Sequence, residues 1–66
     1  MEVKLKFFRN EEKLSQSKVA NSVGISLFTY QKYEYGRRIP QIVTAMKIAD
    51  ILKRDVNEIW VNIYEK

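Results

Sequence analysis

The chain has 66 residues and a net charge of +4, and it contains no cysteine and no histidine. This length allows one domain with one small core, which we expect to span residues 1–66. The missing residue types exclude disulfides, thiolate or imidazole metal sites and a Cys or His nucleophile, and the acidic residues are scattered, so we expect no enzyme activity, no catalytic residue, no metal and no cofactor.

The start of the chain carries two overlapping patterns. Polar and apolar residues alternate over residues 2–7, which is typical of a short strand. A first helix is expected over about residues 5–13, because Leu5 and Phe8 fall on one face. Phe7 lies off that face, so we expect it to be a partly exposed aromatic or part of a second apolar surface.

Residues 16–36 form the most informative stretch, which reads as two short helices around a tight turn. Apolar residues at helical spacing predict the first helix over residues 16–23. Gly24 follows it, where a left-handed residue costs least without a Cβ. Ser26 can cap the second helix, which we expect to run from about Leu27 to Tyr35.

The second of these helices has two faces. Tyr30 and Tyr33 are three residues apart and are expected to point into the core. The opposite face carries Leu27, Phe28, Gln31, Lys32 and Tyr35. Leu27 and Phe28 place apolar side chains at the start of this face. Taken by themselves, they suit packing against the preceding helix or contact with a partner.

A loop over residues 36–40 separates this pair from a fourth helix, expected over about residues 41–53. Pro40 suits the start of that helix. The fourth helix has a broad apolar stripe, which we assign to the core. The stripe comprises Ile42, Ala45, Met46, Ile48, Ala49 and Leu52.

Asp55 and Glu58 have the spacing of a capping box and predict the start of a fifth helix. Beyond Trp60 the residues fit both a helical stripe and strand alternation. Val, Ile and Tyr favour strands, so we predict a short strand over residues 61–64, paired with residues near Val3.

The stretch over residues 14–40 resembles the helix-turn-helix of the Cro/C1-type family, the phage-repressor-like proteins also called the XRE family. The matching residues are Leu14, Ser15, Gln16, Val19, Ala20, Val23, Gly24, Ile25, Ser26, Tyr30, Tyr33, Glu34, Gly36 and Pro40. The resemblance extends from about Leu5 to Trp60. It implies an all-α, five-helix, lambda-repressor-like DNA-binding domain, with the helix-turn-helix over about residues 16–35 and room for a short terminal antiparallel β pair.

The resemblance also implies roles for individual residues. Base reading in the major groove is assigned to Leu27, Phe28, Gln31 and Lys32. Contacts with the DNA backbone are assigned to Gln16, Ser17, Lys18, Thr29, Tyr35, Arg37 and Arg38. Arg9 is implied to form a structural ion pair with Glu34, and a guanidinium fork can bind a carboxylate in a bidentate manner.

The distribution of charge supports a polyanionic partner. From Lys13 to Lys47 there are six basic residues and one acid, Glu34, whereas the rest of the chain holds six basic and seven acidic residues. The helix-turn-helix is therefore the basic part of a nearly neutral scaffold. We predict sequence-specific binding of double-stranded DNA by a transcriptional regulator, a repressor, that is cytoplasmic and nucleoid-associated. The alternative is a protein-interaction module on the same fold, such as an antitoxin-like partner.

Apolar residues near the two ends of the sequence have no evident place in a five-helix core. We assign a dimer interface to Trp60, Val61, Ile63 and Tyr64. Exposed apolar patches usually mark interfaces, so we expect a homodimer on a palindromic operator, with recognition helices about 34 Å apart. The alternative is that these residues cover the core of their own chain. No apolar run is long enough for a membrane span, and no leader pattern is present, so we expect no membrane association.

Overall fold

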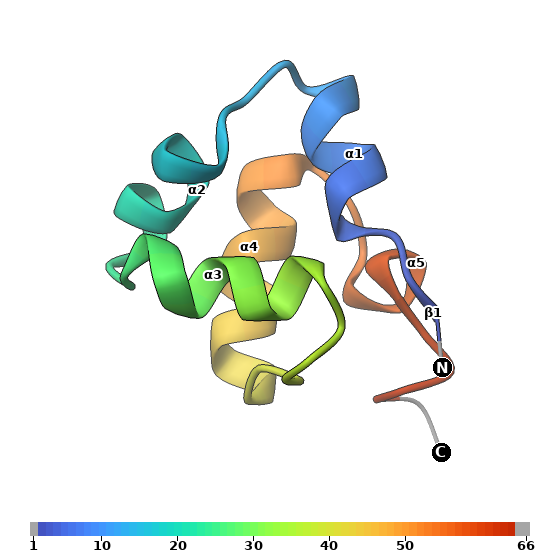
Figure 1. Cartoon of the computed structure of the whole chain (residues 1–66). Helices are drawn as coiled ribbons and strands as arrows, with labels where there is room; N and C mark the ends of the chain where they lie inside the picture. Colours follow the sequence, from blue (N-terminus) through green and yellow to red (C-terminus); the bar gives the residue numbers. More distant parts are fainter. Residues whose placement is uncertain (1, 65–66) are drawn as a thin grey trace.

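The computed structural model describes residues 2–64, which form five short helices and one two-stranded sheet (Figure 1). The elements in chain order are β1 (Glu2–Val3), α1 (Leu5–Glu11), α2 (Gln16–Val23), α3 (Leu27–Glu34), α4 (Ile42–Leu52), α5 (Val56–Ile59) and β2 (Trp60–Val61). This architecture confirms the predicted five-helix fold with a short antiparallel β pair.

Local capping bonds set the limits of the helix-turn-helix. The Ser15 hydroxyl accepts the Lys18 backbone N–H at 3.0 Å, and the Ser26 hydroxyl accepts the Thr29 backbone N–H at 3.0 Å. Each bond satisfies a donor that the first turn of a helix leaves without a partner. Gly24 ends α2 with a φ of 76°, in the left-handed region that glycine adopts without a Cβ penalty.

Helix α1 ends at Glu11, two residues before its predicted end. Lys13 adopts a φ of 58°, and its backbone N–H bonds to the Asn10 carbonyl at 3.0 Å. The next N–H, from Leu14, bonds back to the Arg9 carbonyl at 3.2 Å. This pair of bonds closes the helix in the way a C-terminal glycine would, although no glycine marks the position in the sequence.

Helix α4 lies in the middle of the molecule, behind α3 in Figure 1 and in contact with α2 and α5. It packs into a core to which every helix contributes. The buried apolar residues are Leu5, Val19, Ala20, Tyr30, Tyr33, Ala45, Ile48, Ala49, Leu52, Ile59 and Trp60. The predicted inward positions of Tyr30 and Tyr33 are therefore observed.

The assignment of the whole α4 stripe to the core is wrong at two positions. Ile42 is 45% exposed and Met46 is 54% exposed, and Val43 beside them is 60% exposed. An apolar stripe this broad is wider than the surface that α2 and α5 can cover, so its edge faces outward. Within the described part of the chain, α4 therefore has an exposed apolar face, made of Ile42, Val43 and Met46.

The predicted C-terminal strand exists, but its limits differ. Strand β2 covers Trp60 and Val61 and not residues 61–64, and it pairs antiparallel with β1 in the register Val3 to Trp60. Asn62 has a φ of 62°, which turns the chain out of the strand. The alternation of apolar residues predicted a strand as far as residue 64, but the turn at Asn62 ends the strand after Val61.

The proposed dimer interface is wrong for Trp60, whose side chain is fully buried within its own chain. Ile63 and Tyr64 are partly buried and pack against the core. The Tyr64 hydroxyl also donates to the Pro40 carbonyl. The segment after α5 therefore covers the core of its own chain, which was the alternative to an interface.

Candidate nucleic-acid interface

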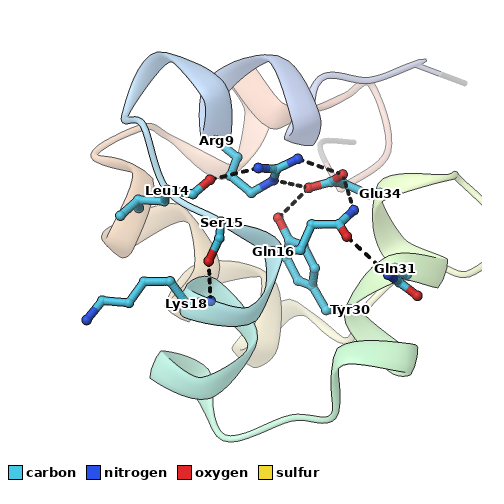
Figure 2. A network of polar contacts seen from close by, with 8 residues as sticks. All are labelled: Arg9, Leu14, Ser15, Gln16, Lys18, Tyr30, Gln31 and Glu34. Atoms are coloured by element: carbon cyan, nitrogen blue, oxygen red, sulfur yellow. Dashed lines mark hydrogen bonds and ion pairs between the residues drawn. The ribbon is translucent and has the colours of Figure 1, made fainter.

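A buried ion pair joins α1 to α3. The Arg9 Nε donates to Glu34 Oε2 at 2.5 Å and the Arg9 Nη2 donates to Glu34 Oε1 at 3.3 Å, so the contact is bidentate (Figure 2). The Arg9 Nη1 also donates to the Leu14 carbonyl at 2.7 Å. Arg9 and Glu34 are 9% and 8% exposed. These bonds fix the position of α3 relative to α1 and to the segment that leads into α2.

Glu34 is the centre of a larger network. Its carboxylate also accepts the Tyr30 hydroxyl at 2.8 Å and the Gln16 Nε2 at 2.9 Å. Burial by itself raises the pKa of Glu34, but the hydrogen bonds from Arg9, Gln16 and Tyr30 outweigh it, and the pKa lies below its ordinary value. Burial and the bond to Glu34 raise the pKa of Tyr30. At neutral pH the network therefore holds an ionised carboxylate and a neutral phenol.

The network continues to the surface through two glutamines. The Gln31 Nε2 donates to the Gln16 Oε1 at 3.1 Å, which connects α3 to the first turn of α2. Gln16 was expected to meet a phosphate and Gln31 a base, and their mutual contact was not predicted. Helical periodicity places each residue on its own helix but contains no information about side chains that meet between two helices.

The outer face of α3 is largely open. Leu27 is 40%, Phe28 is 68% and Tyr35 is 61% exposed. The Lys32 ammonium lies 4.5 Å from the centre of the Phe28 ring, a cation–π contact. A shallow hollow of about 230 Å³ on this side is lined by Phe28, Gln31, Lys32, Tyr35 and Arg37. Apolar, aromatic and cationic groups therefore share one exposed surface.

The residues expected at the DNA backbone lie in three places. Gln16, Ser17 and Lys18 lie in the first turn of α2. Thr29 lies on α3 and Tyr35 is the residue that caps its C-terminus, and Arg37 and Arg38 lie in the loop that follows. Ser17, Lys18, Tyr35 and both arginines are exposed. Gln16 and Thr29 are partly buried. The Thr29 hydroxyl accepts the Ser26 hydroxyl at 2.9 Å, so it is already engaged in the cap of α3.

No group of three or more acidic residues within residues 2–64 could hold a metal ion. No helix in the same range has both the length and the apolar character that a membrane crossing requires. The exposed face of α3 and the basic residues around it are the chemically distinctive surface of the described chain.

Most of the chain matches a known protein family. A family model described as helix-turn-helix matches residues 5–59. The cryptic phage CTXphi transcriptional repressor RstR of Vibrio cholerae serotype O1 is 40% identical over 45 residues, which cover 68% of this chain. The match spans only 40% of the length of RstR.

A solved structure shares the fold. The N-terminal DNA binding domain of SinR from Bacillus subtilis matches with a TM-score of 0.79 over 94% of this chain and 91% of that domain. The two sequences are 22% identical in this comparison, so the likeness concerns the arrangement of the helices. It includes the α2–α3 pair, on which the network and the open face are built.

Proposed function

Since the chain belongs to the Cro/C1-type helix-turn-helix family, we propose that it binds double-stranded DNA in a sequence-specific manner as a transcriptional repressor. Helix α3 enters the major groove, and Leu27, Phe28, Gln31 and Lys32 meet the base edges. The observation that carries the proposal is the open face of α3, which is held in place from behind by the buried Arg9–Glu34 pair. RstR is itself a transcriptional repressor.

The chemistry of this face suits base reading. Leu27 and Phe28 provide exposed apolar surface for thymine methyl groups. Gln31 offers an amide, and Lys32 offers a cation that can donate to guanine. The Lys32 ammonium already lies over the Phe28 ring, so part of its freedom is lost before DNA binds.

The basic side chains suit the phosphate backbone. Lys18 lies at the start of α2, where backbone N–H groups and the helix dipole also attract anions. Arg37 and Arg38 are exposed directly after α3 and would flank the groove. Four phosphate contacts, from these three residues and Lys32, predict that log K falls with log salt with a slope of about −3.6 per subunit.

The test is a salt titration of duplex binding by the parent, the Arg37→Ala variant and a control. Arg37→Ala should weaken specific and nonspecific duplexes alike and make the slope less negative by about 0.9. Lys6→Ala removes the same charge from an exposed position on α1 and should leave the affinity and slope nearly unchanged. Affinity that does not depend on salt, or no affinity for any duplex, would contradict the proposal.

We also propose that the chain forms one domain and acts as a homodimer on a palindromic operator. A domain of this size gains useful affinity when two half-sites are bound together. Of the residues assigned to the interface, Val61, Ile63 and Tyr64 remain partly accessible. The apolar face on α4 is a second surface that a partner copy could cover.

Sedimentation at micromolar concentration tests the oligomeric state. Ile63→Asp and Val43→Asp, measured separately, test which of the two surfaces is used. Loss of the dimer in only one variant would identify the interface, and a monomeric parent would contradict the dimer.

A protein-binding function on the same fold is the second candidate. The specific observation in its favour is the exposure of Phe28, at 68%, together with the open apolar face on α4. This candidate would be favoured over DNA binding if the parent bound no duplex but bound a protein partner, and if the Phe28→Ala variant no longer bound that partner.

A further inference from the structure

A chain of hydrogen bonds runs from the buried Glu34 carboxylate to the exposed face of α3. An ionised carboxylate can only accept hydrogen bonds. The Glu34 carboxylate therefore accepts a hydrogen bond from the Gln16 Nε2, at 2.9 Å. An amide that directs its nitrogen to one partner directs its oxygen elsewhere, and the Gln16 Oε1 accepts the Gln31 Nε2 at 3.1 Å.

The consequence at the surface is a defined orientation of the Gln31 amide. Its nitrogen faces Gln16, and its oxygen points away from the network (Figure 2). An amide nitrogen carries two N–H groups, and the contact with Gln16 uses one. The other N–H and the oxygen remain, so Gln31 presents one donor and one acceptor toward the surface that it shares with Phe28 and Lys32.

Reversal of this orientation is opposed at each step. If the Gln31 amide alone turned over, its oxygen would face the oxygen of Gln16. If both amides turned over, the oxygen of Gln16 would face the carboxylate of Glu34. The carboxylate cannot act as a donor at neutral pH, because Arg9 binds it at 2.5 Å and holds it in its ionised form.

On the basis of the DNA-binding function proposed above, we propose that the buried Glu34 carboxylate, acting through Gln16, sets the polarity with which Gln31 meets the major groove, so that Gln31 selects adenine and rejects guanine. Adenine offers an N6 donor and an N7 acceptor, which match the free acceptor and donor of Gln31. Guanine offers two acceptors, N7 and O6, and one of them would face the amide oxygen. Gln16 is thus a positioning residue for base choice.

The experiment begins with selection of duplexes from a random pool by the parent and by Gln31→Ala. The base pair whose preference is lost in the variant is the position that Gln31 reads. Dissociation constants are then measured for duplexes that differ only there. The parent should prefer adenine to guanine by about tenfold, which is the scale of one bidentate contact.

The decisive variant is Gln16→Met, which keeps the length of the side chain but removes both amide contacts. Gln31 can then turn over, so the preference for adenine over guanine should fall to about threefold or less. Gln41→Met is the matched control, because Gln41 is an exposed glutamine whose side chain makes no capping bond to α4. The control should keep the tenfold preference of the parent.

Circular dichroism establishes whether Gln16→Met folds. If it does not, Gln16→Lys provides the test, because an ammonium can donate to Glu34 but cannot accept from Gln31. The Gln31 oxygen should then turn toward the introduced ammonium and its two N–H groups toward the base, so guanine should be preferred. An unchanged preference for adenine in a folded Gln16→Met or a folded Gln16→Lys would overturn the inference. A parent that prefers guanine at the Gln31 position would also overturn it and leave DNA binding intact. A parent that binds no duplex would overturn the proposed function itself.

Discussion

The two sides of this small domain are held together by different forces. On one side, the polar network of Arg9, Gln16, Tyr30, Gln31 and Glu34 joins α1, α2 and α3 through directional hydrogen bonds. On the other side, α4, α5 and β2 meet through apolar contact, with Leu52, Ile59 and Trp60 fully buried. The directional side lies behind the proposed DNA-reading face, and the apolar side lies away from it.

The difference shows that stability and geometry can be supplied by separate parts of one core. A buried ion pair loses most of its Coulomb energy to desolvation, so its main effect is to define an arrangement. Burial of a large aromatic side chain is favourable in many orientations and stabilises without such precision. The Trp60 Nε1 has no hydrogen-bond partner among the described residues. On this side, the free energy gained by burying the ring therefore exceeds the cost of leaving its N–H unpaired.

The largest expected effect comes from the apolar side. Trp60→Ala should lower the free energy of unfolding by about 3–5 kcal/mol, because it removes a fully buried aromatic and leaves a cavity. Denaturant unfolding followed by circular dichroism measures the loss. Tyr35→Ala removes an exposed aromatic side chain and serves as the control, with an effect within about 0.5 kcal/mol. Equal losses in the two variants would mean that Trp60 is not part of the core.

The polar network should respond differently to single and double changes. Arg9→Ala should cost about 1–3 kcal/mol, because it leaves the Glu34 carboxylate poorly paired. Replacement of both residues by apolar ones of similar size should cost less than this single change. Arg54→Ala is a suitable control, because Arg54 reaches its acidic partners only at 3.8–4.0 Å and is more exposed. A variant of Arg9 that melts like the parent would show that the pair contributes nothing to stability.

A fall in pH should reduce the free energy of unfolding through the polar network, because Glu34 is its ionisable acid, whereas the apolar contacts do not titrate. The pKa of Glu34 is lowered in the folded protein, so its ionised form binds the network more strongly than its neutral form does. This contribution is fully present above the unfolded value of about 4.3 and is lost as the pH falls through the folded pKa. Unfolding curves at a series of pH values should therefore show a loss below about pH 4 that is smaller in Glu34→Gln. A loss of the same size in both proteins would assign it to other carboxylates.

The smallest expected effect lies in the helix cap that orients the reading face. Ser26→Ala should cost about 1 kcal/mol, because the Thr29 N–H loses its acceptor at the start of α3. Ser17→Ala is the matched control, because Ser17 lies in the first turn of α2 and does not cap it. Thermal unfolding of both variants measures the difference. An unchanged Ser26→Ala variant would show that water replaces the hydroxyl at no cost.

Features that depend on neighbouring residues in the chain could be predicted from the sequence. The cap at Ser26, the left-handed Gly24 and the capping box of Asp55 and Glu58 all agree with the structure. Each is a contact within a few residues, so the sequence pattern contains both partners. The resemblance to a known family implied the ion pair of Arg9 and Glu34, which periodicity alone would not reveal.

Features that depend on which surfaces meet could not be predicted in this way. The exposed edge of α4 at Met46 and the buried position of Trp60 follow from how much of each helix its neighbours cover. The contact between Gln16 and Gln31 joins two helices, and neither residue type indicates it. The roles of individual α3 residues toward bases stay predictions until DNA binding is measured.

The pairing of β1 with β2 has a consequence for the time course of folding. The pair joins Val3 to Trp60, so its formation closes a loop that includes nearly all of the chain. Loop closure of this length is entropically costly, whereas the helices need only local contacts and form within microseconds. We therefore expect the β pair to form late. Trp60 is the single tryptophan of the chain, belongs to this pair and is fully buried, so its fluorescence should report the final closing step after the helical signal has appeared.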